Sequence, residues 1–474
     1  RPAGGRGLAG RAAVRRFYSA RAVEARTWLR PDLAGPRARD LGVRIGRTPY
    51  GEVWITIEDS MFLSGPTRQG KTRLLLIPIL LEWMGAALVT SVRTELVVRT
   101  LARRSQRGRP VAVFAPSTDV GALVGSHRLR RWSLTSRCEE QAVALRRARA
   151  LVANAGTGGT ENTSFWEASA QSALAPMLHA AAIGGVGVEE LALWCSDEGR
   201  ARGAVTVLRS RGGRSAAWAD ELEAQLSGDS RTVSNIWATL RSAVGLPLMD
   251  PAVRAALSPQ QGDALDIEHF LEERGTLYVV GSSEDASAPI VGALVEEVYA
   301  VACERANRSE GNRCCPPLGL ILDEINHVAK LPSLPAIMAA GGGSGVWAVV
   351  VEQSRAQSEA RWGAQTASAV WDSAAVKVLL GGITREATLT EVSTALGDRL
   401  VNRRTTQVGR GPASTSLTEY KDATASKGQI HSLPYGQALV LKAGAPALVM
   451  SCLPDARAGG ARGLARAWLA RRLA

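Results

Sequence analysis

The segment FLSGPTRQGKTRLLL at residues 62–76 restricts the fold of this chain more than any other stretch. It contains the pattern G-x-x-x-x-G-K-[ST], with an apolar run before it and a run with helical spacing after it. In such a loop, backbone N–H groups and the positive end of the following helix face phosphate oxygens. The segment therefore predicts a strand, a phosphate-binding loop and a helix, which together indicate an α/β protein.

Two side chains of this loop have specific expected roles. Lys71 is predicted to reach the β- and γ-phosphates of ATP, and the Thr72 hydroxyl to bind Mg²⁺. Lysine is rare here, with six lysines against 51 arginines, so its presence at this position is informative. The forked guanidinium of an arginine is too bulky for the space beneath the phosphates. The predicted nucleotide-binding residues are Gly65, Pro66, Thr67, Arg68, Gln69, Gly70, Lys71 and Thr72.

A second apolar run, LGLILDE at residues 318–324, ends in two acids. Asp323 is predicted to bind Mg²⁺, as a Walker B acid does. Glu324 would polarise the attacking water. The alternative is a buried strand that ends in two solvated acids. Consecutive acids argue against a kinase or a small GTPase, and they favour hydrolysis of the RecA-like or AAA+ kind.

A third run, VWAVVVEQS at residues 346–354, brings Gln353 to the end of another buried strand. An amide at that place is positioned to sense the γ-phosphate from the adjacent strand, although an ordinary strand-end residue would look the same. The predicted catalytic residues are thus Lys71, Glu324 and Gln353, and the predicted metal ligands are Thr72 and Asp323.

Apolar runs with turn signals divide the chain into an α/β part and a helical insertion. Strands are predicted at 51–57, 61–65, 86–91, 111–117, 275–282, 318–324, 345–354 and 375–382, with a helix at 94–104 and a late hairpin at 437–450. Between about 138 and 259 the periodicity is helical. Five parts are predicted: a basic helix-and-loop segment (1–47), the first part of a nucleotide-binding domain (48–134), an inserted all-α domain (135–260), the second part of the nucleotide-binding domain (261–455) and a basic C-terminal helix (456–474).

The net charge of +13 comes from the two ends of the chain. Residues 1–47 carry 12 arginines and three acids, and residues 456–474 carry five arginines and no acid. Such ends suit nucleic acid or an anionic membrane face, although solvated helices would have the same composition. Residues 11–30 are expected to form one helical face, and the polar residues 401–428 a mobile loop.

Other classes of site and location find little support in the sequence. The six cysteines have no metal-ligand or disulfide spacing, which favours a reducing cytoplasm, and the five histidines have no ligand spacing. No apolar run reaches the roughly 18 residues of a membrane span. The chain begins with arginine, so any membrane anchor is expected upstream of residue 1.

The motifs and their order resemble the type IV secretion coupling proteins of the TraG/TraD family, over roughly residues 25–453. The resemblance rests on five segments: SGPTRQGKT, TSVRTEL with Arg93 in place of a family lysine, Phe165-Trp166, LILDEINHVAKLPSLPAIMAAGGGSGVWAVVVEQSRAQSEARWG, and HSLPYGQALVLKAGAPALV. It implies a RecA-like P-loop motor domain with an inserted all-α domain. It also implies ATP and Mg²⁺ as cofactors, with Lys71, Thr72, Asp323, Glu324 and Gln353 at the ATPase positions.

The resemblance further implies a homo-hexamer at the cytoplasmic face of the bacterial membrane. Its partners would be DNA, relaxase or relaxosome proteins, and components of the type IV secretion channel. Such a protein hydrolyses ATP and pumps a relaxase–DNA substrate to that channel. Many relatives have N-terminal transmembrane helices, so membrane association is expected through a segment upstream of this chain.

One departure from the family keeps other functions open. Relatives usually carry an arginine about 19 to 21 residues after the Walker B aspartate, where this chain has Gly342 to Ser344. An arginine finger is worth a factor of about 10³–10⁵ in rate. Either a downstream arginine substitutes, Arg355, Arg361 and Arg385 being the nearest, or hydrolysis is slow. The alternatives are an FtsK-like double-stranded DNA translocase and an ATP-binding recruitment adaptor with little turnover.

Overall fold

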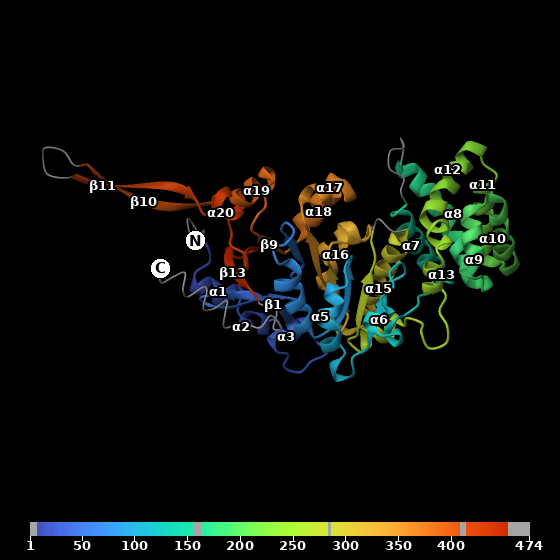
Figure 1. Ribbon diagram of the computed structural model, residues 1–474, viewed down its shortest axis with the longest axis horizontal. Coiled ribbons are helices and arrows are strands. Elements are labelled where there is room, and N and C mark those ends of the chain that lie inside the picture. Colours follow the sequence, from blue (N-terminus) through green and yellow to red (C-terminus); the bar gives the residue numbers. More distant parts are fainter. Residues whose placement is uncertain (1–6, 156–162, 283–285, 408–413, 454–474) are drawn as a thin grey trace.

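The computed structural model describes residues 7–155, 163–282, 286–407 and 414–453, and it contains a large mixed sheet (Figure 1). Its strands are β1 (Gly42–Thr48), β2 (Gly51–Thr56), β3 (Met61–Ser64), β4 (Ala86–Ser91), β5 (Val111–Phe114), β6 (Thr276–Val280), β7 (Leu318–Leu322), β8 (Val346–Glu352), β9 (Val376–Leu380), β12 (Gln437–Lys442) and β13 (Leu448–Cys452). Their order across the sheet is β2-β1-β13-β12-β9-β3-β8-β7-β4-β6-β5. The α/β class predicted from the sequence is therefore confirmed.

Seven neighbouring strands of this sheet, from β9 to β5, are parallel, and the four beyond β9 are antiparallel. β7 and β8 consist of buried residues throughout, as expected for strands covered on both faces. The predicted hairpin at 437–450 is the pair β12–β13. β1 was not predicted, because its sequence GVRIGRT lacks a continuous apolar run.

Helices cover both faces of the sheet. On β8, Ala348 and Val350 pack into one buried cluster, while Val349 and Val351 pack into another, because successive side chains of a strand point to opposite faces. One face is covered by α1 (Arg11–Phe17), α2 (Ala20–Glu24), α3 (Ala38–Leu41), α4 (Ile77–Glu82), α5 (Glu95–Arg104) and α6 (Gly121–Val124). The other is covered by α15 (Ala288–Arg308), α16 (Leu334–Ala340), α17 (Arg355–Trp362) and α18 (Ala364–Ser373).

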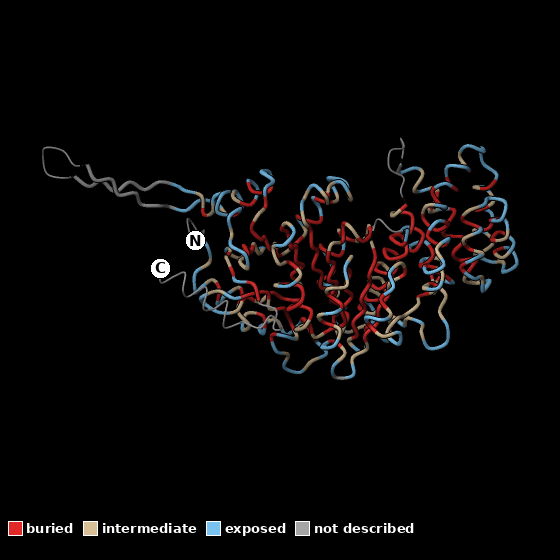
Figure 2. Tube along the Cα trace, viewed as in Figure 1, coloured by how far each residue is buried: buried red, intermediate tan, exposed pale blue. Residues whose placement is uncertain are grey.

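The stretch between β5 and β6 holds the predicted helical insertion, at one end of the molecule in Figure 1. Its helices are α7 (Gln141–Val152), α8 (Thr163–Gly184), α9 (Val188–Ser196), α10 (Glu198–Arg211), α11 (Gly213–Leu226), α12 (Ser230–Leu240) and α13 (Pro251–Ala256), and α14 (Ile267–Glu272) leads back to β6. The described part of 135–260 contains no strand. Figure 2 shows buried residues running without a break from the sheet into this insertion, and they form one apolar cluster.

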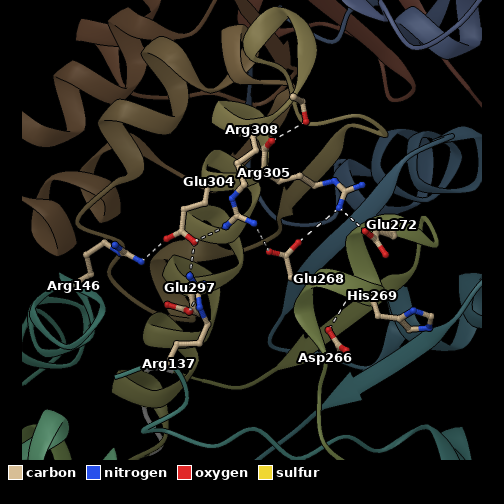
Figure 3. Close-up of polar contacts among 11 residues, drawn as sticks. Arg137, Arg146, Asp266, Glu268, His269, Glu272, Glu297, Glu304, Arg305 and Arg308 are labelled. Atoms are coloured by element: carbon tan, nitrogen blue, oxygen red, sulfur yellow. Dashed lines mark hydrogen bonds and ion pairs between the residues drawn. The ribbon is translucent and has the colours of Figure 1, made fainter. Parts of the chain in front are cut away.

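Charged side chains also join the insertion to α15 (Figure 3). Arg137, which precedes α7, donates to Glu297 at 3.1 Å and also pairs with Glu304. Arg146 of α7 lies 2.9 Å from Glu304. On the other side of α15, Arg305 lies 2.9 Å from Glu272 of α14. Since side chains at the start of the insertion and on α14 after it pair with the same helix, α15 forms the junction between the insertion and the sheet.

The N-terminal prediction was wrong in part. Residues 11–30 form two short helices and a final 3₁₀ turn, Thr27–Leu29, instead of one helical face. Ser19 interrupts the helix, because its hydroxyl accepts from the N–H of Ala22 and caps α2. Val14, Tyr18 and Leu29 are buried as expected, but Trp28 is 58% exposed.

The prediction of a loop at 401–428 was also wrong. β10 (Asp398–Gln407) and β11 (Ser414–Ala423) form a two-stranded antiparallel ribbon that extends away from the body, with α19 (Glu386–Leu396) and α20 (Lys427–His431) at its base (Figure 1). The segment is rich in threonine, which favours strands, but polar residues on both faces conceal the alternation used to recognise a half-buried strand.

Among the residues that the structure describes, no helix is long and apolar enough to cross a membrane. Nor do these residues contain a group of three or more His, Cys, Asp or Glu side chains that could hold a metal ion. The predicted helix at 456–474 lies outside the described residues.

Candidate nucleotide-binding site

The predicted phosphate loop connects β3 to the helical segment that begins at Lys71. Gly70 has a left-handed backbone with φ of 84°, and a Cβ atom there would lie 2.7 Å from Cδ1 of Leu74. Only glycine meets both conditions without strain. The helix begins with a π-helical turn over Lys71–Leu76, followed by Pro78, which has no N–H to donate to the carbonyl of Leu74.

Lys71 lies inside the curl of the loop. Its Nζ donates to the carbonyl oxygens of Gly65 at 2.6 Å and of Pro66 at 2.9 Å, and the residue is buried. Burial lowers the pKa of Lys71, and the carboxylates of Asp323, Glu324 and Glu352 oppose that shift. The Lys71 ammonium therefore lies beneath the loop, at the place where a phosphate group would bind it. The three carboxylates lie close enough to favour its charged form.

Asp323 follows β7 and faces the start of the loop helix. The Thr72 hydroxyl donates to Oδ2 of Asp323 at 3.3 Å, although the two residues are far apart in the sequence. The carboxylate is 4% exposed, and its Oδ1 has no hydrogen-bond partner. A buried acceptor without a partner, next to a threonine hydroxyl, fits Mg²⁺, which binds one or two protein oxygens together with substrate phosphates and water.

Glu324 and Gln353 form the next layer of the site. Nε2 of Gln353 donates to Oε1 of Glu324 at 3.0 Å. Glu324 has an uncommon left-handed backbone, with φ of 49° and ψ of 37°, and strain of this kind persists where the surroundings fix it. β7 and β8 are parallel neighbours, so the residues after them meet at one edge of the sheet.

One cavity of about 590 Å³ brings these groups together. It is lined by Thr67, Arg68, Gly70, Lys71, Thr72, Arg73, Ser91, Arg93, Glu95, Leu96, Asp323, Glu324, Gln353 and Tyr435. Of the predicted loop residues, Gly65, Pro66 and Gln69 do not line it. All five predicted catalytic and metal-binding residues do, so the structure brings these five side chains to one place.

Tyr435 is a lining residue that sequence reasoning missed. It precedes β12, on the side of the phosphate loop away from β7 and β8, and is 58% exposed. A Cβ atom on Gly70 would lie 3.1 Å from the Tyr435 hydroxyl, so this hydroxyl lies against the loop. An exposed aromatic side chain suits stacking on a nucleobase. The only signal in the sequence was its place in LPYGQALVL, ahead of a predicted strand.

A buried polar network supports the site from below. Glu352 accepts from the hydroxyls of Ser64, just before the loop, at 3.1 Å and of Ser358 at 2.6 Å. Asn326 donates to Ser358 at 2.9 Å and accepts from the indole of Trp362 at 2.5 Å. Burial raises the pKa of Glu352, and the two hydroxyls oppose the shift. The ends of β3, β7 and β8 are thus joined by hydrogen bonds beneath the cavity.

Asp323 gives the magnesium-free protein a defined pH dependence. Burial, and then the charge of Glu324, raise the pKa of Asp323 to about 7. An acid with a raised pKa in the folded state destabilises the fold as pH rises from its ordinary pKa, near 4, to about 7. We therefore expect Asp323→Asn to increase the free energy of unfolding at pH 8 by up to about 4 kcal/mol, and to change it little near pH 4.

Thermal unfolding in EDTA at several pH values measures this difference. Asp220→Asn is the matched control, because Asp220 is 77% exposed, and this variant should follow the wild-type curve. A stabilisation by Asp323→Asn that is equal at pH 4 and pH 8 would contradict the assignment of the raised pKa to Asp323.

One segment of the chain is similar to a known protein family. Residues 317–434, about a quarter of the chain, match the family profile described as "TraM recognition site of TraD and TraG". No curated protein sequence matches the chain.

Solved structures provide the wider likeness. The unbound bacterial conjugative coupling protein TrwBdeltaN70 is similar with a TM-score of 0.63 and 18% identity, over 87% of this chain and 88% of that one. TrwB in complex with the ATP analogue ADPNP has a TM-score of 0.58 and 19% identity, over 83% and 86%. TrwB in complex with ADP and Mg²⁺ has a TM-score of 0.59 and 19% identity, over 83% and 85%. These likenesses confirm the predicted RecA-like P-loop domain with an inserted all-α domain.

Proposed function

We propose that the chain is the ATP-hydrolysing coupling protein of a conjugative or type IV secretion system, because residues 317–434 match the TraG/TraD family profile and the fold is similar to that of the conjugative coupling protein TrwBdeltaN70. The observation that carries the proposal is the single cavity that holds Lys71, Thr72, Asp323, Glu324 and Gln353. A phosphate loop alone would suit many nucleotide-binding proteins. The acid pair and the amide at the adjacent strand ends favour hydrolysis by activated water.

The proposed chemistry divides between two walls of the cavity. The loop N–H groups and Lys71 would bind the phosphates of ATP, while Thr72 and Asp323 would hold Mg²⁺. The bound ion would neutralise charge on the phosphate oxygens. Glu324 accepts a proton from water as the water oxygen bonds to the γ-phosphorus. The bond to the β,γ-bridging oxygen breaks, and its electron pair leaves with ADP. Gln353 keeps Glu324 oriented through their hydrogen bond.

The partners and the assembly belong to the same proposal. We place DNA and a relaxase–DNA complex as the transported substrate, and a homo-hexamer at the cytoplasmic membrane face as the working form. Membrane attachment would come from a segment upstream of residue 1. In this proposal residues 48–134 and 261–455 form the motor, and residues 135–260 recruit substrate. Ion pairs of Arg137, Arg146 and Glu272 with α15 link the two parts.

A second candidate function is an ATP-binding adaptor with little turnover. The residues Gly342 to Ser344, where relatives have an arginine, favour it. Gly342 lies in a 3₁₀ turn before β8, and a Cβ atom there would lie 2.6 Å from the carbonyl oxygen of Glu58. The backbone is therefore too close at this position for any larger side chain, arginine included.

DNA-stimulated ATP hydrolysis separates the two candidates. Phosphate release by the purified protein should rise severalfold when DNA is added, because a motor couples turnover to its track. The measurement compares no DNA, single-stranded DNA and double-stranded DNA. Stimulation by double-stranded DNA alone would favour an FtsK-like translocase. Turnover at the background rate in all three conditions would exclude the motor and favour the adaptor.

A further inference from the structure

The arginine missing from Gly342 to Ser344 has a candidate replacement in the cavity itself. We infer that Arg93 is a γ-phosphate-binding residue that acts within its own copy of the chain. This inference rests on the proposed function, since it assigns a further residue to the same nucleotide site. In the sequence, the one distinctive feature of Arg93 is that it occupies a position where relatives have a lysine.

Strand order places Arg93 opposite the phosphate loop. The loop follows β3, and the order β3-β8-β7-β4 puts Gln353 and then the acid pair between the loop and the end of β4. Thr90 of β4 is paired in register with Leu322, the last residue of β7. Arg93 comes shortly after β4 and lines the same cavity as Asp323 and Glu324. An ATP molecule whose phosphates extend from Lys71 toward the two acids would therefore place its γ-phosphate near the end of β4, where Arg93 lies.

The charge of Arg93 is available to a ligand. The residue is exposed, and none of the described carboxylates forms an ion pair with it. Its backbone N–H donates to the Ser91 hydroxyl at 3.2 Å, which holds the turn after β4. Arg68 and Arg73 also line the cavity, but they belong to the loop and its first helical turn, so they lie on the opposite wall.

Arg313 and the three downstream arginines, Arg355, Arg361 and Arg385, are held elsewhere. Arg313 pairs with Glu58 and donates to the carbonyl of Gly342 at 3.0 Å, with its side chain 10% exposed. Arg385 lies 2.9 Å from Glu359, and Arg355 lies 3.8 Å from the same carboxylate and over the ring of Trp371. Arg361 donates to Asn154 at 3.3 Å. None of these four lines the cavity.

A guanidinium at this wall would bind two oxygens of the γ-phosphate in its planar fork. It would stabilise the charge that develops on those oxygens during hydrolysis, which is what an arginine finger does. The contact requires a γ-phosphate, so Arg93 should distinguish ATP from ADP even where no turnover occurs. Binding selectivity therefore tests the inference independently of ATPase activity.

The first experiment measures binding of fluorescent ATPγS and ADP analogues to the wild type and to Arg93→Ala, Arg93→Gln and Arg93→Lys. We expect the alanine and glutamine variants to lose about tenfold or more of the preference for ATPγS, and the lysine variant to keep part of it. Arg103→Ala is the matched control, because Arg103 is exposed on α5 outside the cavity. An unchanged preference in Arg93→Ala and Arg93→Gln would overturn the inference, whereas a wild type that binds neither nucleotide would overturn the proposed function.

The second experiment decides which copy of the chain Arg93 serves. Single-turnover ATP hydrolysis by Arg93→Ala should be at least about 100-fold slower than that of the wild type. Mixing Arg93→Ala with Lys71→Ala should restore nothing, because every cavity then lacks one of the two residues. Recovery of activity in the mixture would show that Arg93 acts on a neighbouring copy and would overturn the inference.

Discussion

A Lys71→Ala variant is expected to lose ATP hydrolysis by a factor of at least about 10³ and to bind ATP weakly. Nζ of Lys71 lies inside the loop, within hydrogen-bond distance of two loop carbonyls, and alanine has no group that reaches phosphate. The same cation would neutralise charge in the ground state and in the transition state, so affinity and turnover should fall together. Phosphate release and fluorescent nucleotide binding measure the two effects.

Lys427→Ala is the matched control for this variant. Lys427 is an exposed lysine that pairs with Glu386 at 3.0 Å, so its removal changes the net charge equally without touching the cavity. The control should keep wild-type affinity and turnover. Hydrolysis by Lys71→Ala at more than about a tenth of the wild-type rate would mean that the measured activity does not come from this site.

A Glu324→Gln variant is expected to bind ATP with nearly wild-type affinity but to turn it over about 10²–10³ times more slowly. Glutamine has the same shape and still accepts the hydrogen bond from Gln353, but it does not accept a proton from water. Binding and chemistry should therefore separate, in contrast to Lys71→Ala. Single-turnover hydrolysis, together with nucleotide binding in Mg²⁺, makes this comparison.

Glu359→Gln serves as the control for the loss of a carboxylate. Glu359 lies on α17, pairs with Arg385 and Arg355, and does not line the cavity. We expect it to hydrolyse ATP normally. If Glu324→Gln instead lost ATP binding to the extent of Lys71→Ala, Glu324 would be a structural residue of the turn and not the group that activates water.

The central strands and the site residues were predictable from the sequence for a physical reason. Strands buried on both faces are short continuous apolar runs, and β4, β7 and β8 have this form. The functional residues come directly after such runs in the sequence, because ligands bind where parallel strands end. Asp323 and Gln353 were found in this way, Lys71 was found from the phosphate-loop motif, and the structure brings all three into one cavity.

Features that depend on strand order, or on polar strands, were not predictable. Arg93 follows β4 and Tyr435 precedes β12, and both line the cavity. The order of the strands in the sheet brings these two segments to the phosphate loop, and that order cannot be read from the sequence. The ribbon β10–β11 was missed because polar residues on both faces conceal the alternation of a strand. The break at Ser19 was missed because a capping hydroxyl interrupts a helix without disturbing the apolar spacing around it.

The strand order also affects how the chain is synthesised. β3 carries the phosphate loop, yet both of its neighbours, β8 and β9, are made only after the whole insertion. β1 pairs with β2 on one edge, but its other edge waits for β13, almost at the end of the described chain. Because translation adds about 5–20 residues per second, this edge of β1 and both edges of β3 stay unpaired for tens of seconds on the ribosome. During that interval the nascent N-terminal half exposes apolar strands that other chains could pair with. A chain with this topology therefore needs chaperone binding more than a chain whose strands pair with near neighbours in the sequence.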